Sequence, residues 1–286
     1  MSYIYNADAK DATKFTHNYN TKLLENRDQE QYKIECEDVE NTKSHLILKL
    51  EDKDIYDDEG NIIYDCKKYP LQQFPGFPDT VNPYLWQINK DNTFAGILKM
   101  AEGYYVASGI DISMIGFIKS DNGWIIVDCG NYINSAQTAL KLAEKAVGEN
   151  IHDNIKAVIY SHSHLDHYGG AGAFITQEQA GNMEDGKIPV IAPGDYEQSL
   201  VDDNLYAGIA MSRRLQYQGG MFLKRGVKGS AGAGLHHPLG IRGEMSMILP
   251  TWQVSGEETV NIDGITLTFI PSPDTETRSH MCVYSN

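Results

Sequence analysis

Cysteine is scarce in this sequence, and the four cysteines lie far apart at Cys36, Cys66, Cys129 and Cys282. None of them belongs to a CxxC pair. Disulfide frameworks are typical of short, cysteine-dense chains. We therefore expect isolated thiols and no disulfide framework.

Basic residues are also in deficit. Lys and Arg number 24 against 39 Asp and Glu, which gives a formal net charge of −15. A phosphate backbone or an anionic membrane needs a basic surface, so this balance argues against nucleic-acid and anionic-membrane partners. If the substrate is an anion, its charge has to be met locally, by a metal ion or by a few well-placed cations.

Long apolar runs are absent. No stretch of 18 apolar residues occurs, so we expect no membrane insertion. The first 30 residues are polar and lack the apolar core of a signal peptide. We therefore expect a cytoplasmic protein, with the periplasm or secretion as the alternative if a signal sequence has been removed.

Two regions with different patterns make up the chain. Residues 1–100 predict a wrapping segment with a polar, helical start and short strands in SHLILKL and NIIYD. Within it, residues 69–86 hold four of the ten prolines, which predicts an extended stretch. Residues 101–286 predict an α/β domain.

The second region begins with an antiparallel meander, because GYYVASG, SMIGFIKS and GWIIVDCG are β-rich runs separated by turn residues. SAQTALKLAEKAVG then has apolar residues at helical spacing, with Ser135 as a candidate N-cap and Gly148 at the end. IKAVIYSH is a short apolar strand. The order strand, helix, strand, polar loop is that of a βαβ unit, whose sites lie beyond the carboxyl ends of strands.

The last of these strands runs into a histidine cluster, SHSHLDHYGG (Ser161–Gly170). His162 and His164 are two residues apart, so in an extended segment their side chains leave the same face. Asp166 and His167 follow, and imidazole and carboxylate groups suit zinc, manganese or iron. Four ligands are more than one open catalytic zinc needs. The cluster therefore predicts two adjacent metal ions, one at His162/His164 and one at Asp166/His167.

A strand followed by H-x-H-x-D-H and Gly-Gly resembles the metallo-β-lactamase superfamily of metal-dependent hydrolases, which implies an αββα sandwich. Over about residues 50–286 the chain is further similar to the alkyl sulfatases of that superfamily. The similarity rests on five stretches in the same order and spacing: FPDTVNPYLW (Phe77–Trp86), GIDISMIGFI (Gly109–Ile118), SHSHLDHYGG, MSRRLQYQGG (Met211–Gly220) and PSPDTE (Pro271–Glu276).

This resemblance implies hydrolysis of alkyl sulfates, such as dodecyl sulfate, by water that two zinc ions activate, and a homodimer in the full-length family. A sulfate monoester is an anion without an easily protonated site, and metal-bound water is a nucleophile at neutral pH. Attack at sulfur or at carbon stays open. The resemblance also implies the metal ligands His162, His164, Asp166, His167 and Glu276, with Asp166 as a catalytic residue.

The chain departs from the family pattern near its end. Asp274 stands where the family has glycine, and TRSHM follows where the family has APAEM. A second glutamate ligand, a sulfate-binding run, a final histidine ligand, a helical dimerisation domain and a sterol-carrier-like domain belong further on. We therefore expect an amino-terminal fragment, with a truncated sandwich, an incomplete metal site and little activity of its own.

Arginine suits bidentate contacts to oxyanions. Arg213, Arg214 and Tyr217 are therefore predicted substrate contacts, with a solvated or ion-paired surface as the alternative. The glycine-rich run 225–243 predicts a mobile or substrate-covering loop and contains two further candidate ligands, His236 and His237.

Two other candidates concern the metal site. Asp128 ends the apolar strand WIIVD and is either a turn residue or a partner that orients a ligand histidine. His280 is a rival of Glu276 as a ligand. Two further functions also stay open, namely a hydrolase of lactones or thioesters and a non-catalytic metal-binding module.

Overall fold

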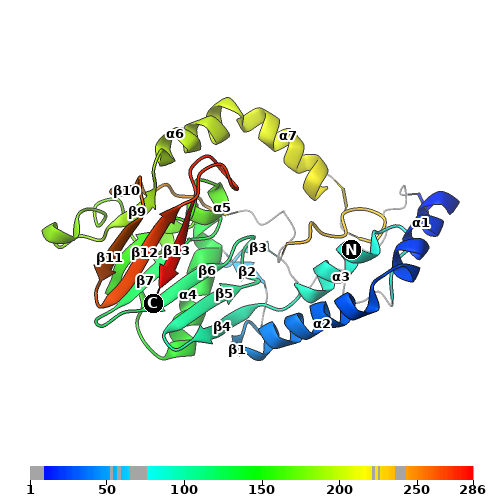
Figure 1. The fold of residues 1–286 in the computed structure, drawn as a ribbon, viewed down its shortest axis with the longest axis horizontal. Coiled ribbons are helices and arrows are strands. Elements are labelled where there is room, and N and C mark those ends of the chain that lie inside the picture. The colour runs from blue at the N-terminus through cyan, green and yellow to red at the C-terminus, as the bar shows by residue number, and fades with distance from the viewer. Residues whose placement is uncertain are drawn as a thin grey trace.

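A computed structural model describes residues 10–51, 54–56, 59–64, 76–220, 223–224, 226–235 and 243–285. Two β-sheets that pack face to face form the body of this part of the chain (Figure 1). The strands of the large sheet, in spatial order, are β1 (Leu46–Lys49), β4 (Gly96–Ala101), β5 (Tyr104–Ser108), β6 (Ile115–Lys119), β7 (Trp124–Val127), β8 (Ile155–Ile159), β9 (Val190–Pro193) and β10 (Trp252–Val254).

The large sheet joins an antiparallel half to a parallel half. Strands β1 to β7 pair antiparallel, and β7 to β10 pair parallel. The predicted meander and the predicted βαβ unit are thus both present, and they meet at β7. Since neighbouring parallel strands end at the same edge, the carboxyl ends of β7 and β8 lie side by side.

The small sheet consists of β11 (Glu258–Ile262), β12 (Ile265–Pro271) and β13 (Met281–Ser285). Its side chains alternate between its two faces, as expected of strands with one buried face. Leu267, Phe269 and Met281 are buried against Ile125 and Ile159 of the large sheet. Outward-facing residues such as Cys282 and Tyr284 are exposed.

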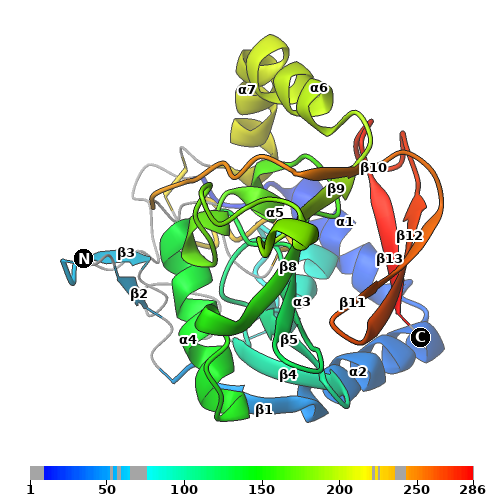
Figure 2. The same ribbon diagram turned by 90° about the vertical axis from the view of Figure 1, so that its left-hand side faces the viewer.

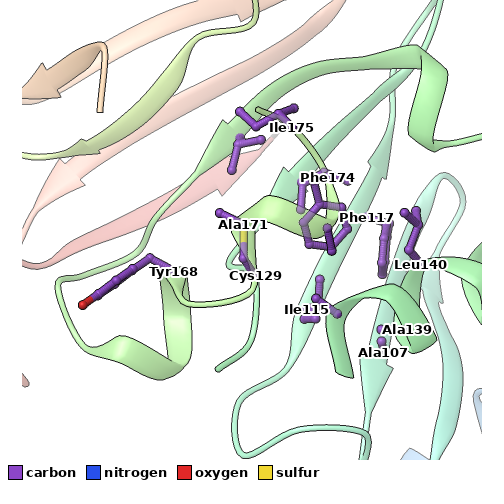
Figure 3. Close-up of a cluster of buried hydrophobic side chains, with 14 of the residues drawn as sticks. Ala107, Ile115, Phe117, Cys129, Ala139, Leu140, Tyr168, Ala171, Phe174 and Ile175 are labelled. Carbon is purple, nitrogen blue, oxygen red and sulfur yellow. The ribbon is translucent and has the colours of Figure 1, made fainter. Parts of the chain in front are cut away.

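Helix α4 (Ile133–Val147) covers the other face of the large sheet (Figure 2). Its apolar stripe, including Ala139 and Leu140, packs on β5 and β6, where Phe117 also meets Phe174 with ring centroids 6.2 Å apart (Figure 3). Helix, large sheet and small sheet are three layers of an αββα sandwich. The predicted α/β class and sandwich are confirmed.

The other regular elements lie around this body. The remaining α-helices of the described residues are α1 (Lys14–Glu25), α2 (Gln29–Ser44), α3 (Pro83–Asp91), α5 (Leu165–Tyr168), α6 (Tyr196–Val201) and α7 (Gly208–Gly219). There are also a π-helical turn at Asp202–Tyr206 and short 3-10 helices at His152–Asn154, Ala171–Ala173 and Met183–Asp185. Strands β2 (Ile55–Tyr56) and β3 (Ile62–Tyr64) form a separate pair. None of the helices in the described ranges is long and apolar enough to cross a membrane.

The structure corrects two local predictions. The stretch 69–86 is not extended throughout, because α3 begins at Pro83, where the fixed φ of proline suits a first helical residue, and the Asn82 side chain caps it. Ser135 is not the N-cap of α4, because the helix already begins at Ile133. Gly148 does end that helix in the left-handed conformation. The domain boundary near residue 100 stays a prediction. In the structure β1, on its amino-terminal side, and β4, which runs across it, both belong to the large sheet.

Two adjacent glycines let the chain after α5 pack tightly against the loop after β7. A Cβ atom on Gly169 would lie 2.2 Å from the Asn131 carbonyl oxygen, and one on Gly170 would lie 2.1 Å from the Cys129 carbonyl oxygen. Both contacts are with backbone, which has little freedom to move. This close approach explains why the histidine cluster is followed by Gly-Gly.

A buried carboxylate, that of Asp111, holds the loop after β7 through hydrogen bonds. Asp111 is 1% exposed and accepts hydrogen bonds from the backbone N–H of Asn131 (2.9 Å) and Tyr132 (3.4 Å) and from the Ser135 hydroxyl. These groups form the start of α4, whose positive end favours a carboxylate. Burial nevertheless raises the pKa of Asp111 to about 6, because it disfavours the charged form more than the hydrogen bonds favour it.

The first prediction concerns Gly170. Gly170→Ala should lower the free energy of unfolding by roughly 1–3 kcal/mol, because the methyl group displaces the backbone at Cys129. Gly256→Ala is the control, since nothing lies within 4 Å of its added Cβ. Urea denaturation of both variants measures the effect, and equal stabilities would contradict the packing described here.

The second prediction concerns Asp111 and pH. Its folded-state pKa of about 6 lies above the ordinary value of 3.8, so its protonated form favours the folded state. This contribution is complete below about pH 4 and is lost as the pH rises through about 6. In metal-free protein, wild-type stability should therefore fall relative to that of Asp111→Asn over this window, by at most about 1.4 kcal/mol per pH unit. Parallel pH profiles in urea denaturation would refute the shift.

Candidate metal centre

The histidine cluster lies where strand β8 ends. His162 and His164 lie in the loop between β8 and the one-turn helix α5. That helix carries Asp166 and His167. His162 is buried, and its Nε2 lies 3.1 Å from Nδ1 of the partly exposed His164. The rings of His162 and His167 are 3.9 Å apart between centroids. The local fold thus gathers the three imidazoles at one edge of the sheet.

Asp128 joins the ends of β7 and β8 beneath this cluster. Its φ is +58°, a left-handed conformation that aspartate tolerates better than most residues. One carboxylate oxygen accepts a hydrogen bond from the Ser161 N–H, and the other accepts one from the Ser161 hydroxyl, both at 2.8 Å. The second oxygen also lies 2.8 Å from Nδ1 of His167. Of the two roles open to Asp128, the structure therefore favours orientation of a histidine.

Ser161 extends the same network to a second histidine. Its hydroxyl oxygen lies 2.9 Å from Nδ1 of His162. With Nδ1 occupied in this way, Nε2 of His162 is left to face His164 and Glu276. Sequence reasoning missed this serine, although its place at the strand end, directly before the first histidine, is a usable signal. A hydroxyl there can fix the ring orientation that a metal ligand needs.

Burial and charge drive the pKa values of His162 and His167 apart. Burial, and next the nearby His167, lowers the pKa of His162 to about 3. Burial also acts to lower the pKa of His167, but the hydrogen bonds and charges of Asp128 and Asp166 outweigh it and raise this pKa to about 10. His162 is therefore neutral at pH 7, as a ligand must be, whereas a metal at His167 has to displace a proton.

Asp166 lies beside His167, with Oδ2 3.4 Å from its Nε2. Burial raises the pKa of Asp166, but the hydrogen bond and the charge of His167 lower it by more, so the carboxylate is ionised at neutral pH. The backbone of Asp166 is fixed from another element, because the Ser113 hydroxyl donates to its carbonyl oxygen. Sequence reasoning missed Ser113 as well, since it lies 53 positions away.

Glu276 reaches the cluster from the small sheet. It lies in the loop between β12 and β13, and its Oε1 is 3.8 Å from Nδ1 of His164 and 3.9 Å from Nε2 of His162. The donor atoms of these three residues all lie within 4.8 Å of one another. His280, the rival candidate, has its Nδ1 2.7 Å from the Ser272 hydroxyl and 3.0 Å from the Thr275 hydroxyl.

The residues present fit a metal ion. Zinc binds nitrogen and oxygen ligands at about 2.1 Å, so two ligands of one ion are at most about 4.2 Å apart. The distances within His162, His164 and Glu276, and the 3.4 Å distance between His167 and Asp166, satisfy this limit. Among the described residues, His162, His164 and Glu276 form a group that could hold a metal ion, with the His167/Asp166 pair beside it. The ligand roles themselves stay predictions.

The predicted substrate contacts lie elsewhere. Arg213, Arg214 and Tyr217 are on α7 and are exposed, Tyr217 to 90%. The structure gives them no hydrogen bond or ion pair to the cluster or to any other described residue. His236, His237 and Cys66 fall outside the described residues.

Comparisons with known proteins identify the family of this chain. The family model of the metallo-beta-lactamase superfamily matches residues 109–285, which include the cluster and Glu276. An alkyl/aryl-sulfatase of Saccharomyces cerevisiae is 33% identical over 250 residues, covering 86% of this chain and 37% of that protein. An (R)-specific secondary-alkylsulfatase of a Pseudomonas species is 30% identical over 278 residues, covering 97% of this chain and 40% of that protein.

A solved structure is similar over nearly the whole chain. The stereoselective inverting sec-alkylsulfatase of a Pseudomonas species superposes with a TM-score of 0.82 at 29% identity, covering 98% of this chain and 43% of that one. The chain therefore spans well under half the length of these relatives. Its family match, its two-sheet fold and its histidine cluster lead to one conclusion: the chain belongs to the metallo-beta-lactamase superfamily, and its relatives there are alkylsulfatases.

Proposed function

We propose that the protein that contains this chain hydrolyses alkyl sulfate esters to an alcohol and sulfate. The observation that carries the proposal is the similarity of 98% of this chain to a sec-alkylsulfatase structure, at a TM-score of 0.82. Relatives named as alkylsulfatases cover 84–97% of the chain, which also supports the proposal. Because the chain spans only 35–40% of those relatives, the activity is proposed for the whole protein.

We further propose that the site holds two zinc ions, with ligands from His162, His164, Asp166, His167 and Glu276. When bound, the metal supplies Lewis acidity that makes water nucleophilic at neutral pH. The chemistry of the donor set supports this choice, since imidazole and carboxylate are the ligands of catalytic zinc. A dication pair would also supply the positive charge that a chain of net charge −15 needs near an anionic ester.

The protein groups then have separate tasks. Asp128 and Ser161 hold the rings of His167 and His162 in place, so little reorganisation accompanies the reaction. Asp166 stays ionised and orients the attacking water as a hydrogen-bond acceptor. Arg213, Arg214 and Tyr217 are retained as proposed substrate contacts, and the homodimer and the cytoplasmic location stay predictions.

The third prediction concerns metal binding by this chain. Zinc should bind, and His164→Ala should weaken it by roughly 100-fold or more, because a direct ligand is lost. Glu276→Gln should weaken it by about tenfold, because a neutral amide replaces a charged ligand. Isothermal titration calorimetry measures both effects.

Two variants act as controls for the zinc titration. His152→Ala removes an exposed histidine at the opposite end of β8, and Glu257→Gln changes an exposed glutamate before β11. Both should bind zinc like the wild type. If the wild type takes up no transition metal, or if all four variants bind alike, the metal site is wrong.

The fourth prediction concerns the reaction. The whole protein, loaded with zinc, should release sulfate from dodecyl sulfate faster than it hydrolyses a lactone or a thioester, and chelation should abolish the release. Sulfate and alcohol are measured together, since both products form in equal amounts. A higher kcat/KM on the thioester or the lactone would replace the proposed substrate class while keeping the metal chemistry.

A further inference from the structure

The loop that carries Glu276 is fixed at its base. The Ser272 N–H donates to the His280 carbonyl oxygen at 2.9 Å, and the Ser272 hydroxyl lies 2.7 Å from the His280 ring. The Met281 N–H donates to the Ser161 carbonyl oxygen at 2.9 Å, next to the first histidine of the cluster. The base of the loop is therefore joined to the chain just after β8.

The tip of the same loop is attached to a different element. Ser279 is buried, and its hydroxyl donates to the Gly194 carbonyl oxygen at 2.9 Å, just before α6. Arg278 extends to both ends of α6: its guanidinium lies 3.8 Å from Asp195, which precedes the helix, and 3.4 Å from Asp202, which follows it. In Figure 1 the loop between β12 and β13 rises to α6. The loop thus bridges the small sheet and α6.

Glu276 lies between these two attachments. Its side chain is 61% exposed, and its carboxylate has no hydrogen bond to any described residue apart from the approaches of 3.8 and 3.9 Å to His164 and His162. The carboxylate itself is therefore not held, and its position depends on the backbone. That backbone is determined by the base of the loop and by the ties at Arg278 and Ser279.

The two attachments differ in strength. Ser279 is buried and makes one hydrogen bond, whereas Arg278 is 55% exposed and meets two carboxylates. Without the arginine, no cation would lie between Asp195 and Asp202 and a loop that itself carries the carboxylates of Asp274 and Glu276. Like charges repel, so the tip would tend to leave α6. Exposed ion pairs contribute little to global stability, so this change would alter the loop without unfolding the protein.

We propose that Arg278 is a positioning residue of the metal site: its ion pairs with Asp195 and Asp202 hold the loop so that the Glu276 carboxylate stays over His162 and His164. This inference rests on the proposed metal-binding function. It also makes the start of the π-helical turn, Asp202, part of the support of the site. Such turns are rare and occur frequently at functional sites.

The fifth prediction follows from this proposal. In zinc titrations of this chain, Arg278→Gln and Asp202→Asn should each weaken binding by about tenfold, the size of effect seen when partners of metal ligands are removed. Arg278→Lys should restore part of the loss, because it keeps the charge. Lys99→Gln is the control, because it breaks an exposed ion pair with Glu102 in a part of the sequence far from Arg278. This variant should bind zinc like the wild type.

A Glu276→Gln background makes the test specific. There Arg278→Gln should have no further effect, because the carboxylate that it positions is already gone. Equal weakening in both backgrounds, or wild-type binding by Arg278→Gln, would overturn the proposal. If Glu276→Gln alone binds like the wild type, the failure lies in the proposed ligand and not in Arg278. If Arg278→Gln also lowers the Tm of the metal-free protein, the zinc affinities of Asp202→Asn, which keeps the arginine, are compared in the two backgrounds instead.

Discussion

The carboxylate of Asp128 joins the ends of two parallel strands, and the rest of the site depends on this junction. It accepts hydrogen bonds from the backbone N–H and the hydroxyl of Ser161, through which it orients His162, and it contacts His167 directly. An aspartate serves here because it tolerates the left-handed backbone after β7 and accepts several hydrogen bonds at once. These hydrogen bonds fix the orientation of the histidine rings, which lowers the cost of ordering them.

The backbone packs tightly around this junction of β7 and β8. The loop after β7 has to pass close to the chain after α5, and only glycine at positions 169 and 170 leaves room for it. Asp111 supports that loop from within the protein, at the cost of a buried carboxylate whose pKa rises to about 6. Stability and site geometry are thus linked through the same few backbone segments.

The second sheet adds a carboxylate on the side of His162 and His164. Asp166 already lies beside His167, whereas the Glu276 carboxylate comes to His162 and His164 from a loop more than 100 residues further along the chain. Its approach requires that β11 to β13 pack on the large sheet through Ile125, Ile159 and Phe269. It also requires that the loop tip stay on α6. The large-sheet face, the small sheet and α6 therefore all contribute to one carboxylate position.

By itself, the sequence determined the order of strands and helices around the βαβ unit and the dense histidine cluster, because these depend on local periodicity and on residues close together in the chain. The sandwich fold and the family were predicted from the resemblance of the cluster and of four other stretches to known families. The sequence did not determine the start of α3 at Pro83 or that of α4 ahead of Ser135, where capping and packing outweighed the local pattern. Nor did it identify Ser113, Ser161 or Arg278 as supports. Their partners lie 53, 33 and 76 positions away, at Asp166, Asp128 and Asp202, so only the packing of the sheets and of α6 brings them into contact.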